Sequence, residues 1–156
     1  MIATLHGALA EKHPSRLVVD ISGVGYEVNV PLSTFYAVGD LGTDVRLQIH
    51  THVREDTLSL FGFATRLEIE LFEHLIGISG VGPRLALAVL SGLEPADLVR
   101  AIRNADVARL TGIPGVGKKT ADRISLELKD KLPAVVVDDQ EKTELTDESE
   151  DLQSDV

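Results

Sequence analysis

The chain has 156 residues, and 44% of them are hydrophobic, which is enough to form one ordinary domain or two small ones. The absence of cysteine excludes disulfides and thiolate metal sites, and the absence of a long apolar run or signal-peptide pattern leads us to expect a soluble, cytoplasmic protein. The net charge of −10 is unevenly distributed: residues 1–134 carry −2 and residues 135–156 carry −8.

The first 63 residues alternate between apolar and polar side chains in the manner of β-strands. Turn signals at 12–15, 22–23, 39–44 and 54–57 separate the alternating runs. Five short strands in this length predict a closed barrel of the oligonucleotide-binding (OB) type, a fold that serves many binding tasks. The predicted strands are ATLHGALA, RLVVDIS, VGYEVNV, VRLQIHTHV and LSLFGF.

After Phe63 the hydrophobic spacing becomes helical. An amphipathic helix is predicted around Leu67–Ile76, and two later helices carry a proline, Pro83 or Pro95, in the first turn. A short helix follows Asp106 as N-cap and stops at Gly112, and a last helix covers 118–131 before Pro133. The predicted organisation is a β domain (1–63), an all-α domain (64–133) and an acidic, flexible linker or tail (134–156).

The predicted helical domain contains an internal repeat. Shifted by 35 residues, LIGISGVGPRLALAV (75–89) aligns with LTGIPGVGKKTADRI (110–124), with seven identities and one charge-conserving match, Arg84 with Lys119. Such a repeat predicts that one structural unit occurs twice. The unit is a helix, a Gly-apolar-Gly hairpin, and a second helix that opens with a basic residue.

This helix-hairpin-helix unit is suited to binding phosphate. Its two glycines can take positive φ and carry no side chain, so backbone N–H groups can approach an anion, while the inward-turning valine holds the hairpin. The helix dipole and the basic side chains add positive charge. The alternative is that the glycines only permit tight turns, but two copies in one register favour DNA binding. The predicted DNA-binding residues are Gly80, Val81, Gly82, Arg84, Gly115, Val116, Gly117, Lys118, Lys119 and Arg123.

The segment GIPGVGKKTA also resembles a nucleotide-binding P-loop. That loop needs Ser or Thr directly after its lysine and a buried strand before it, whereas Lys119 occupies the hydroxyl position and a short helix is predicted upstream. The first copy has Pro83 in place of the lysine. We therefore expect both hairpins to contact DNA backbone phosphates, so that specificity comes from shape rather than base sequence.

The segments MIATLHG, SGVGYEV and VREDTLSLFGF, followed by ISGVGPRLALAVLSGL and IPGVGKKTADRISLELKDKL, resemble the RuvA family of Holliday-junction-binding proteins over residues 1 to about 132. The resemblance implies an OB barrel followed by a tandem helix-hairpin-helix domain. It also implies a homotetramer, with an octamer on DNA as the alternative, that holds a four-way junction open and has no active site of its own. The implied partners are the ATPase RuvB and, as a further candidate, the resolvase RuvC.

In that family an acidic turn lies at the junction centre, and Glu55 and Asp56 match it. Carboxylates at a crossover would repel phosphates and keep the arms apart, whereas the residues without the resemblance favour an ordinary solvated hairpin turn. The family continues into a small third helical domain that contacts RuvB. We expect this chain to lack that domain, by truncation or by nature, and we expect junction binding to persist without it.

Two other functions are compatible with parts of the sequence. A helix-hairpin-helix glycosylase or nuclease would need a base-flipping pocket or a metal cluster, for which no spare domain is left. A single-strand binder would stack bases on aromatic side chains, but most of the six Phe and Tyr residues have the spacing of core residues. The five histidines show no ligand pattern, and no catalytic residue, metal or cofactor is predicted.

Overall fold

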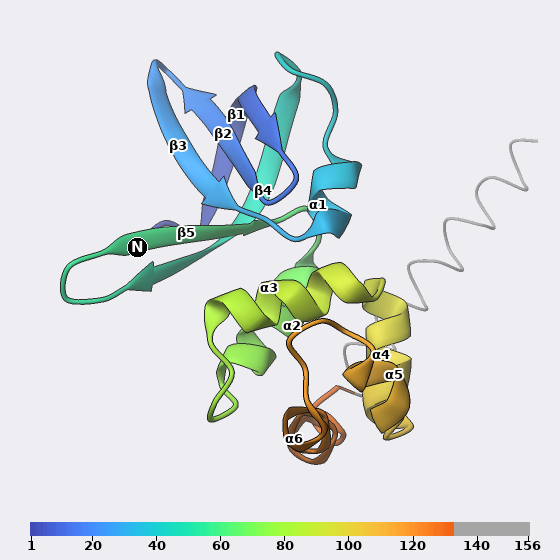
Figure 1. The fold of residues 1–156 in the computed structure, drawn as a ribbon. Coiled ribbons are helices and arrows are strands. Elements are labelled where there is room, and N and C mark those ends of the chain that lie inside the picture. The colour runs from blue at the N-terminus through green and yellow to red at the C-terminus, as the bar shows by residue number, and fades with distance from the viewer. Residues whose placement is uncertain (133–156) are drawn as a thin grey trace, which may run out of the picture.

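A computed structural model of the chain describes residues 1–132. A β-barrel lies against a group of helices (Figure 1). The barrel closes in the strand order β1-β2-β3-β5-β4, which confirms the predicted five-stranded OB barrel. In the part of the chain that the structure describes, no helix is long and apolar enough to cross a membrane. The strands are β1 (Thr4–His13), β2 (Arg16–Ile21), β3 (Val24–Asn29), β4 (Asp44–Val53) and β5 (Leu58–Phe63).

The barrel interior is filled by alternate apolar side chains. Leu17, Val19 and Val28 are fully buried there, as the two-residue period of a strand requires. Neighbouring strands pair antiparallel except β3 and β5, which pair parallel at Asn29 and Phe61. β1 continues to His13, so the turn predicted at 12–15 is shorter than expected. Strand pairing with β2 extends through Lys12 and His13 and overrides their turn-like composition.

Gly62 on β5 gives a prediction about barrel packing. A Cβ at this position would overlap Cγ1 of Val28 and approach Cδ1 of Leu47 and of Ile49 to 3.3 Å. Gly62→Ala should therefore lower the free energy of unfolding by about 1–3 kcal/mol through overpacking, as measured by urea denaturation. Combining it with Val28→Ala should cost less than the sum of the two single changes. A strictly additive double variant would contradict this explanation.

Five helices follow the barrel and form a second hydrophobic core. Leu75, Leu98, Ile102 and Ile124 are among its fully buried members. Helix α6 ends at Leu128 rather than at Lys131, although Leu132 beyond it is still buried in the core. Pro133 and the predicted acidic segment 134–156 lie outside the described residues. The helices are α2 (Arg66–Ile76), α3 (Pro83–Gly92), α4 (Pro95–Arg103), α5 (Val107–Thr111) and α6 (Lys118–Leu128).

The local signals for these helices act as expected. Pro83 and Pro95 occupy the first turns of α3 and α4. The Asp106 carboxylate accepts a hydrogen bond from the Arg109 backbone N–H at 3.2 Å, which makes it the N-cap of α5. The pairs α2–α3 and α5–α6 are the two helix-hairpin-helix units, which confirms the predicted tandem, and α4 connects them.

A short helix that the sequence analysis missed, α1 (Leu32–Ala37), links the two parts. The carboxylate of buried Glu68 on α2 accepts hydrogen bonds from the hydroxyls of Ser33 at 2.8 Å and Thr34 at 2.6 Å, both on α1. Thr65, the N-cap of α2, donates to the same carboxylate at 2.8 Å. These contacts fix the barrel to the first helix-hairpin-helix unit.

Aromatic packing adds a second link between barrel and helices. Phe61 and Phe63 of β5 lie against Phe72 of α2, with ring centroids 5.2 Å and 4.9 Å apart. All three rings belong to the core of the helical part. The β4–β5 hairpin is thus held in a defined position relative to the first helix-hairpin-helix unit.

Candidate nucleic-acid interface

The two hairpins of the repeat have the same backbone geometry. Gly80 and Gly115 both have φ of +90°, and the residue after each donates its backbone N–H to the carbonyl three residues earlier, at 3.0 Å for Val81 and 3.1 Å for Val116. Both valines are buried, as expected for side chains that hold the hairpin to its helices. The repeat in sequence is therefore a repeat in conformation.

The second glycine of each pair differs from the expectation. Gly82 and Gly117 have φ of −91° and −87°, so positive φ is confined to the first glycine of each hairpin. Their extended backbone places them as N-caps of α3 and α6, and no atom lies within 4 Å of where a Cβ would stand. The missing side chain leaves open space in front of each helix, where an anion can approach the backbone.

Both helices begin with backbone N–H groups that no capping side chain satisfies. The first N–H bonded back to the N-cap carbonyl is that of Ala86 in α3 and of Ala121 in α6. Three amides precede it in α6, and two precede it in α3 because Pro83 has none. The N-termini of α3 and α6 therefore present free donors and the positive end of the helix dipole, an arrangement that in proteins generally favours phosphate.

Three cationic side chains surround these helix starts. Arg84, Lys118 and Lys119 are exposed, and none forms an ion pair within residues 1–132. Their charge is therefore not neutralised by a carboxylate at contact distance. The structure brings every predicted hairpin residue to the starts of α3 and α6, and the role of these residues in DNA binding stays a prediction.

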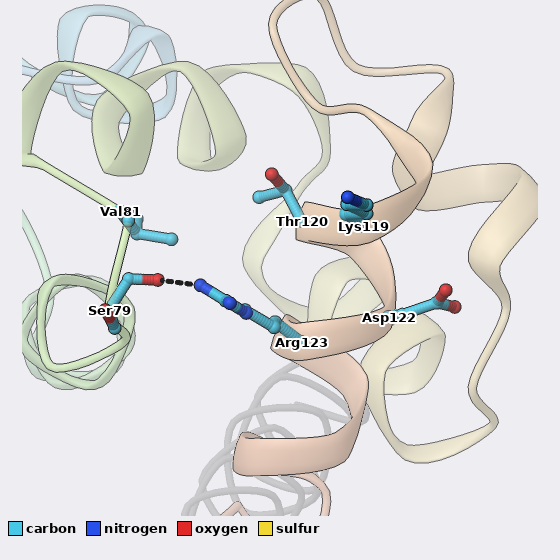
Figure 2. A pocket seen from close by; sticks show the side chains of 7 residues that line it. Ser79, Val81, Lys119, Thr120, Asp122 and Arg123 are labelled. Carbon is cyan, nitrogen blue, oxygen red and sulfur yellow. Dashed lines mark hydrogen bonds between the residues drawn. The ribbon is translucent and has the colours of Figure 1, made fainter.

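Arg123 has a second role that the sequence did not reveal. Its Nη1 donates to the Ser79 carbonyl at 2.9 Å, so α6 of the second unit is tied to the hairpin of the first (Figure 2). Both side chains border a hollow of about 380 Å³ between the two units, which Lys119 and Thr120 also line. On the other side, a Cβ at Gly115 would lie 3.4 Å from Leu85 of α3. Each hairpin thus lies beside the second helix of the other unit.

The acidic residues Glu55 and Asp56 lie at the tip of the β4–β5 hairpin, which projects from the barrel (Figure 1). The Arg54 backbone N–H donates to the Thr57 carbonyl at 2.8 Å and closes the turn. Both carboxylates are exposed and have no ion-pair partner within the described range. They present uncompensated negative charge on the same molecule as the cationic hairpins.

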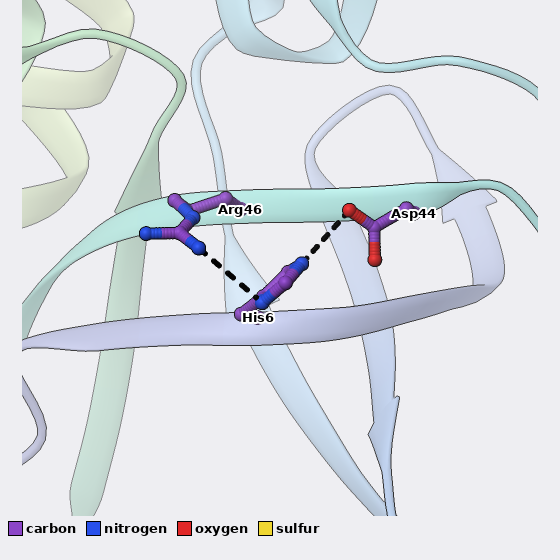
Figure 3. Close-up of polar contacts among 3 residues, drawn as sticks. All are labelled: His6, Asp44 and Arg46. Atoms are coloured by element: carbon purple, nitrogen blue, oxygen red, sulfur yellow. Dashed lines mark hydrogen bonds and ion pairs between the residues drawn. The ribbon is translucent and has the colours of Figure 1, made fainter.

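The histidines give no sign of a metal centre. No cluster of three or more His, Asp or Glu ligands occurs in residues 1–132. His50 packs against Phe72, and burial lowers the pKa of this imidazole, an effect that the Glu73 carboxylate partly offsets. His6 contacts Asp44 at 2.8 Å and Arg46 at 3.5 Å on the outer face of β1 and β4, as an exposed polar cluster (Figure 3).

Comparison with known proteins agrees with this geometry. Residues 1–62 match the RuvA N terminal domain and residues 72–130 match the SAM-like helix-hairpin-helix tandem. A "Holliday junction branch migration complex subunit RuvA" from Solibacter usitatus is 58% identical over 134 residues, covering 86% of this chain and 68% of the relative. The chain belongs to the RuvA family.

Other RuvA proteins show the same extent of match. The protein from Geobacter sulfurreducens is 51% identical over 132 residues, covering 85% of this chain and 66% of its own length. That from Pseudomonas aeruginosa is 53% identical over 134 residues, covering 86% and 67%. The chain therefore spans about two thirds of the length of these RuvA relatives.

Proposed function

We propose that this chain binds four-way junction DNA through its backbone phosphates and holds the arms apart for branch migration in recombination and repair. The duplicated hairpin carries the proposal, because both copies combine a positive-φ glycine, an uncapped helix start and an unpaired cation. Two such sites side by side suit the two strands of one duplex. The RuvA relatives bear the name of a Holliday junction branch migration complex subunit.

The proposed contacts recognise the shape of the DNA backbone rather than its base sequence. Amides at a helix start and flexible cationic side chains hydrogen-bond to phosphate oxygens, which every nucleotide presents. Residues 1–134 carry a net charge of only −2, so cations clustered at the hairpins can attract DNA although the whole chain is acidic. Specificity for a junction then requires several hairpins and the acidic turn in one fixed arrangement, for which we propose a homotetramer, or an octamer on DNA.

We assign no catalysis to this chain. The segment GIPGVGKK follows helix α5, whereas a nucleotide-binding P-loop follows a strand, and it has the same backbone as its twin, GISGVGPR. Energy for branch migration would then come from a partner ATPase of the RuvB type, with a RuvC-type resolvase as a further partner. Because the proposed ligand is cellular DNA, we place the protein in the cytoplasm.

Two rival functions receive less support from the structure. A glycosylase or nuclease needs a base pocket or a metal cluster, and residues 1–132 hold no such cluster. A single-strand binder needs exposed aromatic platforms, but of the six Phe and Tyr side chains only Tyr36 is exposed.

Neutralising the acidic turn tests how the arms are held. The double change Glu55→Gln and Asp56→Asn should leave junction affinity unchanged or raise it by up to about threefold, because it removes repulsion from phosphates without removing a donor. It should also shorten the distance between adjacent arms. Energy transfer between dyes on two arms measures this distance, and titration of the same junction measures affinity.

The matched control is Asp40→Asn with Glu27→Gln, which removes two exposed carboxylates elsewhere on the barrel domain. This control should leave the arm distance unchanged. If the double change at the turn instead abolished folding, the turn would be structural. If it weakened binding tenfold, the carboxylates would not act by repulsion.

A further inference from the structure

A groove lies between the acidic β4–β5 hairpin and the first helix-hairpin-helix hairpin. It is a hollow of about 460 Å³, lined from the barrel side by Arg54, Thr57 and Ser59 and from the helical side by Gly82 and Arg84. Glu55 and Asp56 adjoin Arg54 in sequence but do not line the hollow. The groove therefore has cationic and hydroxyl groups on its walls and no carboxylate.

Arg54 is held in place by contacts that continue into the core. Its Nε–H donates to Nε2 of His52 at 3.0 Å, and the His52 ring meets Phe61 edge-on at 6.2 Å. Phe61 in turn stacks on Phe72 of α2 at 5.2 Å. An arginine fixed through Nε loses less conformational entropy when its two amino groups bind a ligand. His52 is thus a positioning residue for the Arg54 guanidinium.

The other wall supplies a second guanidinium. Arg84 lies in the first turn of α3, two residues after the open backbone at Gly82. Neither Arg54 nor Arg84 forms an ion pair within residues 1–132. Two unpaired guanidinium groups on facing walls of one groove match the planar recognition of a phosphate by arginine. The fixed contacts between barrel and helices keep these walls at a constant separation.

We propose that this groove binds a backbone phosphodiester of the DNA strand that the acidic turn deflects at the crossover, with Arg54 as its main ligand and Arg84 opposite. The inference rests on the proposed junction binding. Glu55 and Asp56 repel the strand on one side and Arg54 attracts it on the other, so the two charges of adjacent residues together set the direction in which the strand leaves the crossover. A linear duplex on the hairpins has no strand diverging at this point.

Arg54→Gln tests the groove. With a fixed, labelled four-way junction, this change should weaken binding at least about tenfold, the loss expected when one subunit loses its charge-assisted contact. The slope of log K against log salt, which is negative, should become shallower by about 0.9 for each subunit whose Arg54 contacts a phosphate. Binding to a linear duplex of the same base sequence should change less than about twofold, because only the junction brings a strand into the groove.

Two further variants sharpen the result. Arg46→Gln removes the same charge from β4 eight residues earlier, about 26 Å away along the strand, and should leave both affinities and both salt slopes unchanged. His52→Phe keeps a ring against Phe61 but removes the acceptor for Arg54. It should weaken junction binding about threefold without changing duplex binding, an effect that a purely structural role would not confine to the junction.

The outcomes separate this inference from the proposed function. A wild-type protein that prefers the junction, together with an Arg54→Gln variant of unchanged affinity and salt slope, would overturn the groove alone. Equal losses on junction and duplex would do the same, because Arg54 would then act as a general surface charge. A wild-type protein without junction preference would overturn both. The midpoint temperature of thermal unfolding is measured for each variant. A midpoint equal to that of the wild-type protein establishes that the variants differ in binding and not in folding.

Discussion

The double change Lys118→Ala and Lys119→Ala should weaken four-way junction binding by about two orders of magnitude, whatever the base sequence of the junction. Both side chains lie in the first turn of α6, where three backbone amides are free, and neither forms an ion pair within the described chain. Each phosphate contact that is lost lowers the affinity about tenfold. The negative slope of log K against log salt should become shallower by about 0.9 for each lost contact. Fluorescence titration at several salt concentrations measures both quantities.

The matched control removes two lysines from the other end of the same helix. Lys129 and Lys131 are exposed and follow the last turn of α6, about 16 Å from its start. Lys129→Ala with Lys131→Ala should change junction affinity less than about threefold, because these charges are far from the helix N-terminus. Unchanged affinity after the loss of Lys118 and Lys119 would contradict the assignment of the second hairpin as a phosphate site.

Glu68→Ala should lower the free energy of unfolding by about 3 kcal/mol. Glu68 is 3% exposed, and its carboxylate accepts hydrogen bonds from Ser33, Thr34 and Thr65. Removing it deprives three hydroxyls of their acceptor, of which only that of Thr34 is fully buried, and leaves a cavity between α1 and α2; a buried donor without a partner costs about 1–3 kcal/mol. The hydrogen bonds that are lost are those that join the barrel to the helices.

Urea unfolding followed by circular dichroism measures this effect. Glu73→Ala removes an exposed glutamate from the same helix and should change stability by less than about 0.5 kcal/mol. In Glu68→Ala the barrel and the helices should also unfold in more clearly separated transitions, because one of their links is lost. A Glu68→Ala protein as stable as the Glu73→Ala protein would show that the polar link contributes little.

The fold followed from the sequence where the hydrophobic pattern was long enough to show its period. The two-residue alternation indicated all five strands, and prolines and Asp106 marked helix starts at the right places. Helix α1 was missed because its six residues are too few to display a helical period. Its conformation depends on tertiary contacts, since Thr34 is completely buried and bonded to Glu68, 34 residues away.

The candidate site could be predicted from the sequence where its features depend only on residues close together in the chain. The repeat indicated both hairpins and their cations, but glycine content alone did not show that, of the four hairpin glycines, only Gly80 and Gly115 have positive φ. The contact of Arg123 with Ser79 spans 44 residues and has no local signal. The groove at Arg54 could not be predicted from the sequence either, because its walls come from two distant segments, the β4–β5 hairpin and the start of α3. The alternation of β4, continued one residue past its end at Val53, places His52 and Arg54 on the same side and was the only hint in the sequence.

The most direct test compares the affinity of the wild-type chain for a four-way junction, a linear duplex and a single strand of matched sequence at one salt concentration. Paired phosphate sites on a rigid frame predict binding to the junction at least tenfold tighter than to the duplex, and weakest binding to the single strand. The ranking should persist when the base sequence of the junction is changed. Equal affinity for junction and duplex, or tightest binding to the single strand, would contradict shape-specific recognition by the two hairpins.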